Sequence, residues 1–312
     1  KVQSTPMTAL ILDYKHDYQK DEFLMSVGGK VLKPHKIPLD IFRVSGEDTN
    51  PNRYKRARAF VDVIKKIYQG VGPVQVDNLI QVIMDAYAAN NGSPTIAEIA
   101  AGYRAKVPNG DSVVATLNIF VMQEIFSSDK TELKTLAELI DGSVLVLDLR
   151  ELDPDTATKN ALVALFLNQY LEYMIQLQKW PFEKKGDTTL RRINSYVVVD
   201  EATNIMEKNF DALMVLLLQG REYGVGVLLS SQYLSHFSPS GGVDYCEPLL
   251  TWFVHNVPNV TISELKNIGL PGANQADADR VASLQVHGAL YKSLNYSGKF
   301  IRGKPFFELP KD

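Results

Sequence analysis

Four short apolar runs, each followed directly by polar residues, constrain most strongly what this chain can fold into. The runs are unbroken rather than alternating and rich in β-branched residues, which is typical of strands buried on both faces. Short runs of this kind also occur in buried helices, so their period alone does not decide between the two. The runs are Thr8–Leu12, Val144–Leu147, Tyr196–Val199 and Val225–Leu229, followed by Asp13, Asp148, Asp200-Glu201 and Ser230-Ser231-Gln232.

Helical patterns lie between these runs. Ala157–Lys179 and Ile205–Tyr223 carry apolar residues at helical spacing. Alternation of strands and helices predicts an α/β fold, in which a mostly parallel, RecA-like sheet is flanked by helices through right-handed crossovers. Three further strands are expected at Leu250–His255, Gly288–Leu294 and Lys299–Arg302.

The stretch 50–141 has a different character. Helical patterns dominate it, and turn signals such as Gly70-Val71-Gly72-Pro73 and Pro108-Asn109-Gly110 separate them. We therefore expect an all-helical insertion at 50–141 within one core formed by 1–49 and 142–312. The 312 residues are enough for a sizeable buried core.

Composition excludes several classes of protein. The one cysteine, Cys246, rules out an intramolecular disulfide framework and cysteine-rich metal sites, and it fits a cytoplasmic protein. A net charge of −3 argues against a uniformly basic nucleic-acid binder, although local basic patches remain compatible with it. No 18 consecutive residues are apolar and Lys1–Pro6 has no apolar core, so neither a membrane span nor a signal peptide is expected.

The third run is the strongest local signal for chemistry. An apolar strand that ends in Asp200-Glu201 is a Walker B pattern. In such a pattern the first carboxylate holds Mg²⁺, usually through water, and the second orients a water for attack on a γ-phosphate. Acidic residues also follow strands simply because they suit the next turn or helix cap, and this alternative stays open.

The fourth run adds an amide and a cation. Its strand ends in Ser230-Ser231-Gln232, and an uncharged amide beside carboxylates can sense a γ-phosphate without repelling it. Arg221 lies at the end of the preceding helix, where a cation offsets the helix dipole. Arg221 can equally reach a phosphate in a neighbouring subunit, and Gln232 can equally be a satisfied loop residue.

With these pieces in place, the chain resembles the HerA/FtsK class of P-loop translocases. The resemblance implies a RecA-like core, a ring-forming, often hexameric assembly, and hydrolysis of ATP with Mg²⁺ coupled to double-stranded DNA. Within the class the chain is most similar to the ATPase subunit (DptH/DndH) of phosphorothioation-dependent DNA restriction systems. The matching segments are Ala9–Tyr18, Val199–Ala202, Gly220–Gln232 and Lys299–Glu308.

The Walker B reading and the resemblance together give a set of expected site residues. Glu201, Gln232 and Arg221 are the expected catalytic residues, and Asp200 is expected to hold Mg²⁺ through water. His16 stands where the class often has glycine and receives no catalytic role. The expected cofactor-binding residues are Asp13, Asp17, Asp200 and Arg302, with turn capping as an equal alternative for Asp13 and Asp17.

The chain departs from the class in one respect, because it contains no usable P-loop. The motif G-x-x-x-x-G-K-[ST] needs a hydroxyl residue and a following helix. Gly298–Lys304 matches the first seven positions, but Pro305 replaces the hydroxyl residue. We expect the P-loop to precede Lys1 and the chain as given to be inactive alone; a degenerate ATPase is the alternative.

DNA contacts are expected from local basic patches, since phosphates need only local positive charge. A charge run is also commonly a solvated face, so each patch has this alternative. A further basic stretch carries Lys30, Lys33 and Lys36, and Arg191-Arg192 lies beyond a loop. The residues expected to contact DNA are Arg53, Lys55, Arg56, Arg58, Lys184 and Lys185.

The leading hypothesis is therefore an ATP-driven DNA translocase or helicase-like motor in a restriction complex that serves antiphage defence. Two alternatives stay open. One is a non-catalytic assembly or nucleotide-sensing module of the same complex, and the other is a conjugation- or secretion-type ATPase. A P-loop upstream would exclude the first, and membrane spans elsewhere in the full protein would favour the second.

Overall fold

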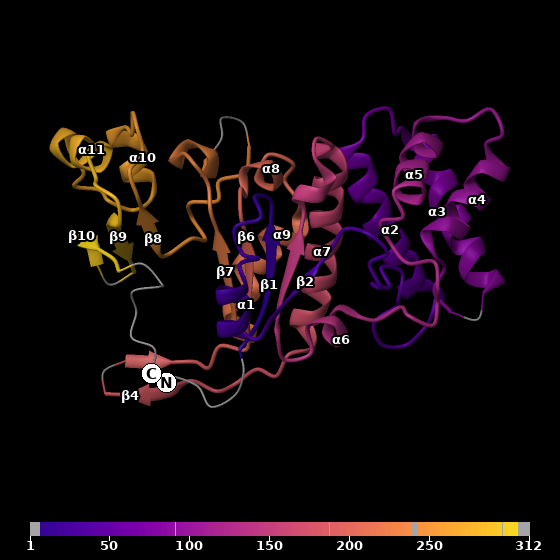
Figure 1. Cartoon of the computed structure of the whole chain (residues 1–312), viewed down its shortest axis with the longest axis horizontal. Coiled ribbons are helices and arrows are strands. Elements are labelled where there is room, and N and C mark those ends of the chain that lie inside the picture. The colour runs from indigo at the N-terminus through magenta and orange to yellow at the C-terminus, as the bar shows by residue number, and fades with distance from the viewer. Residues whose placement is uncertain (1–6, 91, 187, 239–241, 295, 305–312) are drawn as a thin grey trace. The chain divides into compact units, whose positions relative to one another are not determined.

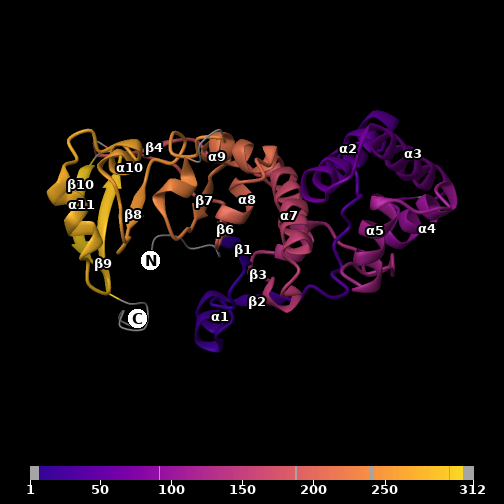
Figure 2. The same cartoon turned by 90° about the horizontal axis from the view of Figure 1, so that it is seen from above.

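The computed structural model describes residues 7–90, 92–186, 188–238, 242–294 and 296–304. Contacts divide the chain into two units, and Figures 1 and 2 show the elements of both. The first unit is Lys1–Asp200 with Phe210–Leu229, and the second is Glu201–Asn209 with Ser230–Asp312. The expected boundary between a core and an insertion at 50–141 stays a prediction.

A five-stranded parallel sheet lies at the centre of the first unit, which confirms the predicted α/β fold. Every residue of the second and third strands in the sheet order, β3 and β1, is buried. Their apolar runs are unbroken for this reason, since neither face of these strands meets water. The strand order is β2 (Gly29–Leu32), β3 (Val144–Asp148), β1 (Thr8–Asp13), β6 (Ser195–Val199) and β7 (Val225–Leu229).

The strand order reverses direction between β1 and β6, which makes this position the topological switch point of the sheet. From β1 the chain continues to β2 on one side, and from β6 it continues to β7 on the other. Ligands in open parallel sheets bind at such a point, outside the carboxyl ends of the strands. The register sets Asp13 beside Asp148 and Leu12 beside Val199, so polar residues after three strands meet at this edge.

Helices α7 (Thr156–Gln176) and α9 (Asp211–Tyr223) pack against each other in this unit. The sequence pattern predicts one helix over Ile205–Tyr223, but the structure has a short α8 (Thr203–Met206) before α9. Asn209 adopts a left-handed backbone with φ 51°, which no α-helix accommodates. The two helices are therefore separate elements.

Several helices lie between β2 and β3 in the chain, as the helical pattern predicts. Figures 1 and 2 both show α7 between the sheet and this group, and α2 packs on α7. Capping side chains stabilise the N-termini of two of these helices. Thr95 and Glu98 form a capping box before the helix that begins at Ile96, and Asp111 accepts from two backbone N–H groups of the helix that begins at Ser112. The helices are α2 (Asn50–Ile67), α3 (Pro73–Ala89), α4 (Ile96–Lys106), α5 (Ser112–Met122) and α6 (Leu136–Ile140).

Several small elements of the first unit, among them a helix and a hairpin, are not predicted from the sequence. Helix α1 (Asp21–Val27) connects β1 to β2, and its left-handed C-cap is Gly28 at φ 62°. The stretch between Lys184 and Arg191, which the sequence predicts as a loop flanked by basic residues, takes part in a hairpin of β4 (Glu183–Lys185) and β5 (Thr188–Leu190).

The second unit contains a three-stranded antiparallel sheet, so the three C-terminal strands expected from the sequence are present. The strands are β8 (Trp252–Val254), β9 (Gly288–Ser293) and β10 (Tyr296–Arg302), in the order β10-β9-β8. Helices α10 (Ile262–Asn267) and α11 (Gln275–Ala282) precede β9, and the Arg280 guanidinium stacks on the Phe300 ring of β10. Within the described residues of both units, no helix is long and apolar enough to cross a membrane.

Cys246 provides a test of the packing in this unit, because it is the one cysteine of the chain. It is 7% exposed, and burial, helped by the nearby Asp244 charge, raises the pKa of its thiol to about 12. At pH 8 about one thiol in 10⁴ is then ionised, so a disulfide reagent should label native Cys246 slowly and the urea-unfolded chain rapidly. Fast labelling of the native protein at pH 8 would contradict this packing.

Candidate functional site

Three aspartates follow the strands that meet at the switch point. Asp13 and Asp148 end β1 and β3 side by side and are both buried. Asp200 directly follows β6, and its backbone N–H donates to the Leu12 carbonyl at 3.2 Å. The strand register and this hydrogen bond therefore bring Asp13, Asp148 and Asp200 to one edge of the sheet.

The Asp13 carboxylate organises the loop that follows β1. Its Oδ1 accepts from the backbone N–H groups of Lys15 and Asp17 at 3.2 Å each, and its Oδ2 accepts from Tyr18 N–H at 3.1 Å and Gln19 Nε2 at 3.4 Å. These contacts fit the turn-capping alternative. The expectation that Asp13 and the exposed Asp17 bind the cofactor stays a prediction.

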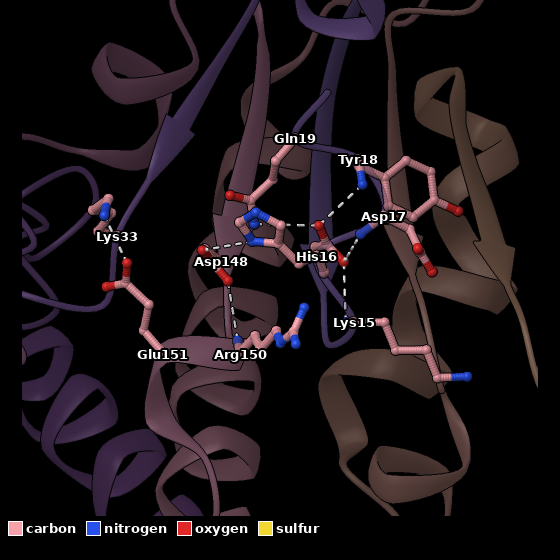
Figure 3. Close-up of polar contacts among 10 residues, drawn as sticks. Lys15, His16, Asp17, Tyr18, Gln19, Lys33, Asp148, Arg150 and Glu151 are labelled. Atoms are coloured by element: carbon pink, nitrogen blue, oxygen red, sulfur yellow. Dashed lines mark hydrogen bonds and ion pairs between the residues drawn. The ribbon is translucent and has the colours of Figure 1, made fainter. Parts of the chain in front are cut away.

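His16 lies at the tip of this loop. Its backbone is left-handed, with φ 69°, a conformation that glycine adopts without strain and other residues adopt rarely. Its Nδ1 lies 3.2 Å from Oδ2 of the buried Asp148, and Figure 3 shows the His16 ring directed at Asp148. His16 thus pairs with the carboxylate at the end of β3.

The phenol of Tyr18 lies among the carboxylates of this edge. Burial raises the pKa of Tyr18, and the negative charges of Asp200, Asp13 and Asp17 raise it further. Tyr18 is therefore partly buried and close to three carboxylates. Among the described residues, however, no three His, Cys, Asp or Glu side chains are grouped closely enough to hold a metal ion by themselves.

Glu201 and Gln232 contact each other within the second unit. The Gln232 amide donates to both carboxylate oxygens of Glu201, at 3.2 and 3.3 Å. Glu201 has a left-handed backbone with φ 49°, and strained backbone of this kind concentrates at functional sites. The sequence placed these two residues at the ends of neighbouring strands, and the structure brings their side chains together.

A hydroxyl–imidazole cluster beside this pair was missed by the sequence reasoning. Thr203 Oγ1 and Ser231 Oγ lie 2.8 Å apart, and His236 Nδ1 lies 2.9 Å from the first and 2.7 Å from the second. These contacts link the segment that follows Glu201 to the segment that contains Gln232. No spacing signal reveals the cluster, because its partners lie up to 33 positions apart.

The backbone between Gly220 and Gln232 contains two positions that leave no room for a side chain, Gly224 and Gly226. Gly224 ends α9 at φ 69°, and a side chain there would start 2.6 Å from the Arg192 carbonyl. Gly226 faces the Tyr196 ring so closely that a Cβ atom would overlap it. Arg221, one turn earlier, has an exposed side chain, and its carbonyl accepts from Arg191.

The basic run at the start of α2 is mostly engaged in ion pairs. Arg53 makes two hydrogen bonds to Asp48, and Arg58 pairs with Asp62. Arg56 is 5% exposed and pairs with Glu172, so its guanidinium is not available to a phosphate and the expected DNA contact does not fit its position. Lys55 is exposed.

The other basic residues differ in their surroundings. Lys184 is exposed on β4, and the Lys185 side chain lies outside the described part of the structure. Lys33 pairs with Glu151 at 2.6 Å, as Figure 3 shows, and Lys36 lies 3.6 Å from Glu124. Arg302 ends β10 and is exposed. DNA contact by Lys55, Lys184 and Lys185, and cofactor contact by Arg302, stay predictions.

Removing the Asp13 carboxylate tests its role in the loop. Asp13→Ala leaves three backbone N–H groups without their acceptor and should lower the free energy of unfolding by about 1–3 kcal/mol. Asp17→Ala is the matched control, since its side chain is exposed, and should change stability by less than about 0.5 kcal/mol. Equal stability of the two variants in urea titrations would show that Asp13 does not hold the loop.

Comparison with known proteins finds similarity of fold to solved structures and no closer relationship. No protein-family description matches the chain, and no curated protein is significantly similar to it. VirB4 of Thermoanaerobacter pseudethanolicus shares the fold with a TM-score of 0.70 and 14% identity, over 96% of this chain and 82% of that one.

The plasmid coupling protein TrwB shares the fold as well. Its complex with ADP and Mg²⁺ has a TM-score of 0.60 and 13% identity, over 95% of this chain and 78% of TrwB. Its complex with a non-hydrolysable ATP analogue has a TM-score of 0.59 and 14% identity, over 95% of this chain and 78% of TrwB. The α/β fold inferred from the sequence is therefore one that nucleotide-binding proteins of known structure share.

Proposed function

We propose that this chain forms the core of an ATP-hydrolysing motor of the conjugation or secretion type. The observation that carries the proposal is the contact of the Gln232 amide with the Glu201 carboxylate, directly after Asp200 at the end of β6. An acidic pair after a buried strand, with an amide on its second member, is the residue set of a Walker B site with a γ-phosphate sensor.

The proposed roles follow from the chemistry of each group. Asp200 would hold Mg²⁺ through water, since a carboxylate at the charged edge beside Tyr18 is the hard oxygen ligand that this ion prefers. Glu201 would orient the attacking water, and Gln232 would report whether the γ-phosphate is present. Bound Mg²⁺–ATP supplies the phosphoryl group, and Mg²⁺ neutralises the charge that develops on it.

The comparisons favour the conjugation or secretion reading over the restriction motor that the sequence favoured. The solved structures that share the fold include a VirB4 and a conjugative coupling protein, the latter with ADP and Mg²⁺ or an ATP analogue. Three finer proposals are not supported directly by any of these likenesses. They are a duplex DNA substrate, a ring assembly in which the exposed Arg221 reaches a neighbouring subunit, and a place in a DptH/DndH-type restriction complex.

The experiment is a phosphate-release assay on the protein extended upstream of Lys1 to include the expected P-loop. We expect ATP hydrolysis that EDTA abolishes and that the 312-residue chain by itself does not perform efficiently. Absence of hydrolysis in the extended protein would contradict the proposal and favour the assembly module. Stimulation by duplex DNA would identify DNA as the transported molecule, whereas hydrolysis that DNA leaves unchanged would favour protein export.

A further inference from the structure

One face of the three-stranded sheet of the second unit is apolar, aromatic and exposed. Along β8, Trp252 and Val254 are buried whereas Phe253 between them is 59% exposed. Successive side chains of a strand point to opposite faces, so Phe253 lies on the face away from the buried residues. The outward face of the sheet therefore carries a large ring where a solvated strand normally has a polar residue.

The neighbouring strands extend this feature into a row. The register places Phe253 beside Tyr291 of β9, and Tyr291 beside Lys299 of β10. The two ring centroids are 5.0 Å apart, at an interplanar angle of 41°. These three residues and Ile301 line a shallow hollow of about 500 Å³. The row thus offers aromatic surface with a cation at one end.

The strands that form this row carry basic but no acidic side chains. The sequence from Arg280 to Lys304 contains no Asp or Glu, and neither do the residues of β8. Lys299, Arg302 and Lys304 are all exposed on or just after β10. In a chain whose net charge is −3, such an acid-free basic strand favours a polyanionic partner.

We infer that this face binds an unpaired nucleic-acid strand, with a base stacked on Phe253 and Tyr291 and a phosphate beside Lys299. Aromatic residues on an exposed sheet bind bases because every base has a flat π-face, and nearby cations track the backbone. The bases of a duplex are already stacked on each other, so the row discriminates against paired strands. This site is separate from the residues of the proposed function and does not depend on ATP hydrolysis.

The test is fluorescence anisotropy of a fluorescein-labelled oligothymidylate of about 20 nucleotides with the whole chain, in the absence of nucleotide. Phe253→Ala should weaken binding about tenfold, in line with the loss of one stacked base. Phe253→Trp and Tyr291→Phe keep the rings and should retain binding. Lys299→Gln should lower the slope of log affinity against log salt by about 0.7.

Val286→Ala is the matched control, since it removes an apolar side chain that is 75% exposed outside the row, and it should bind as the wild type does. Circular dichroism checks that each variant is folded. Equal binding by Phe253→Ala and the wild type would overturn the inference, as would a duplex bound as tightly as the single strand. A change in self-association with unchanged oligonucleotide binding would instead make this face an interface between copies. Because binding is measured without ATP, failure of the ATPase assay would leave this result standing.

Discussion

Glu201→Gln should lower ATP hydrolysis at least ~100-fold in the upstream-extended protein, because loss of a group that orients and activates the attacking water typically costs 10²–10⁴ in rate. The substitution keeps the size of the side chain and an oxygen that can accept from the Gln232 amide. Nucleotide binding should therefore be retained, and the loss should appear in kcat rather than in KM.

The measurement is steady-state phosphate release together with binding of a fluorescent ATP analogue. Glu207→Gln makes the same chemical change at an exposed position six residues later and should hydrolyse ATP as the wild type does. If Glu201→Gln hydrolyses ATP at the wild-type rate, Glu201 has no part in the mechanism and the Walker B assignment is wrong.

Leu12→Ala should lower the free energy of unfolding of the first unit by about 2–5 kcal/mol. Leu12 is fully buried in the third of the five strands, beside Leu147 on β3 and Val199 on β6. Strands on both sides prevent the site from collapsing, so the cost includes a cavity as well as the lost transfer free energy. The same change loosens the strand end from which Asp13 and the loop with His16 project.

The two tryptophans allow the unfolding of each unit to be followed separately. Trp180 lies in the first unit and Trp252 in the second, so Trp252→Phe leaves a fluorescence signal from the first unit alone. In this background Leu12→Ala should shift the urea midpoint strongly, whereas Met25→Ala, 76% exposed in α1, should shift it little. Similar midpoints for the two variants would show that β1 is not at the centre of the sheet.

The sequence predicts most of the sheet because its central strands are buried on both faces. Unbroken apolar runs give β1, β3, β6 and β7 nearly to the residue. It does not reveal β2, whose four residues Gly29–Leu32 include a glycine and a lysine and are only partly buried at the edge of the sheet. Gly29–Leu32 shows neither an unbroken apolar run nor a clear alternation, whereas β7 at the other edge keeps an apolar run although it is only partly buried.

The basic run at the start of α2 shows where sequence reasoning fails for single side chains. Four cations within six residues predict a phosphate-binding face, with a solvated face as the alternative. The helix turns Arg56 inward, where it pairs with Glu172 of α7, while Lys55 and Arg58 remain exposed. A charge count cannot distinguish these residues, because their partners come from segments far away in the chain.

The sequence by itself determined the fold class and the polar residues that end the strands, because burial on both faces and the end of a strand are local properties that leave a local pattern. Only the tertiary structure decided what those residues contact. Asp13 caps its own loop, His16 pairs with Asp148, and Gln232 reaches Glu201 beside a cluster formed by Thr203, Ser231 and His236. Except for the Asp13 loop, these contacts depend on strand order, register and the turns that follow the strands, which bring together residues that have no fixed spacing in the chain.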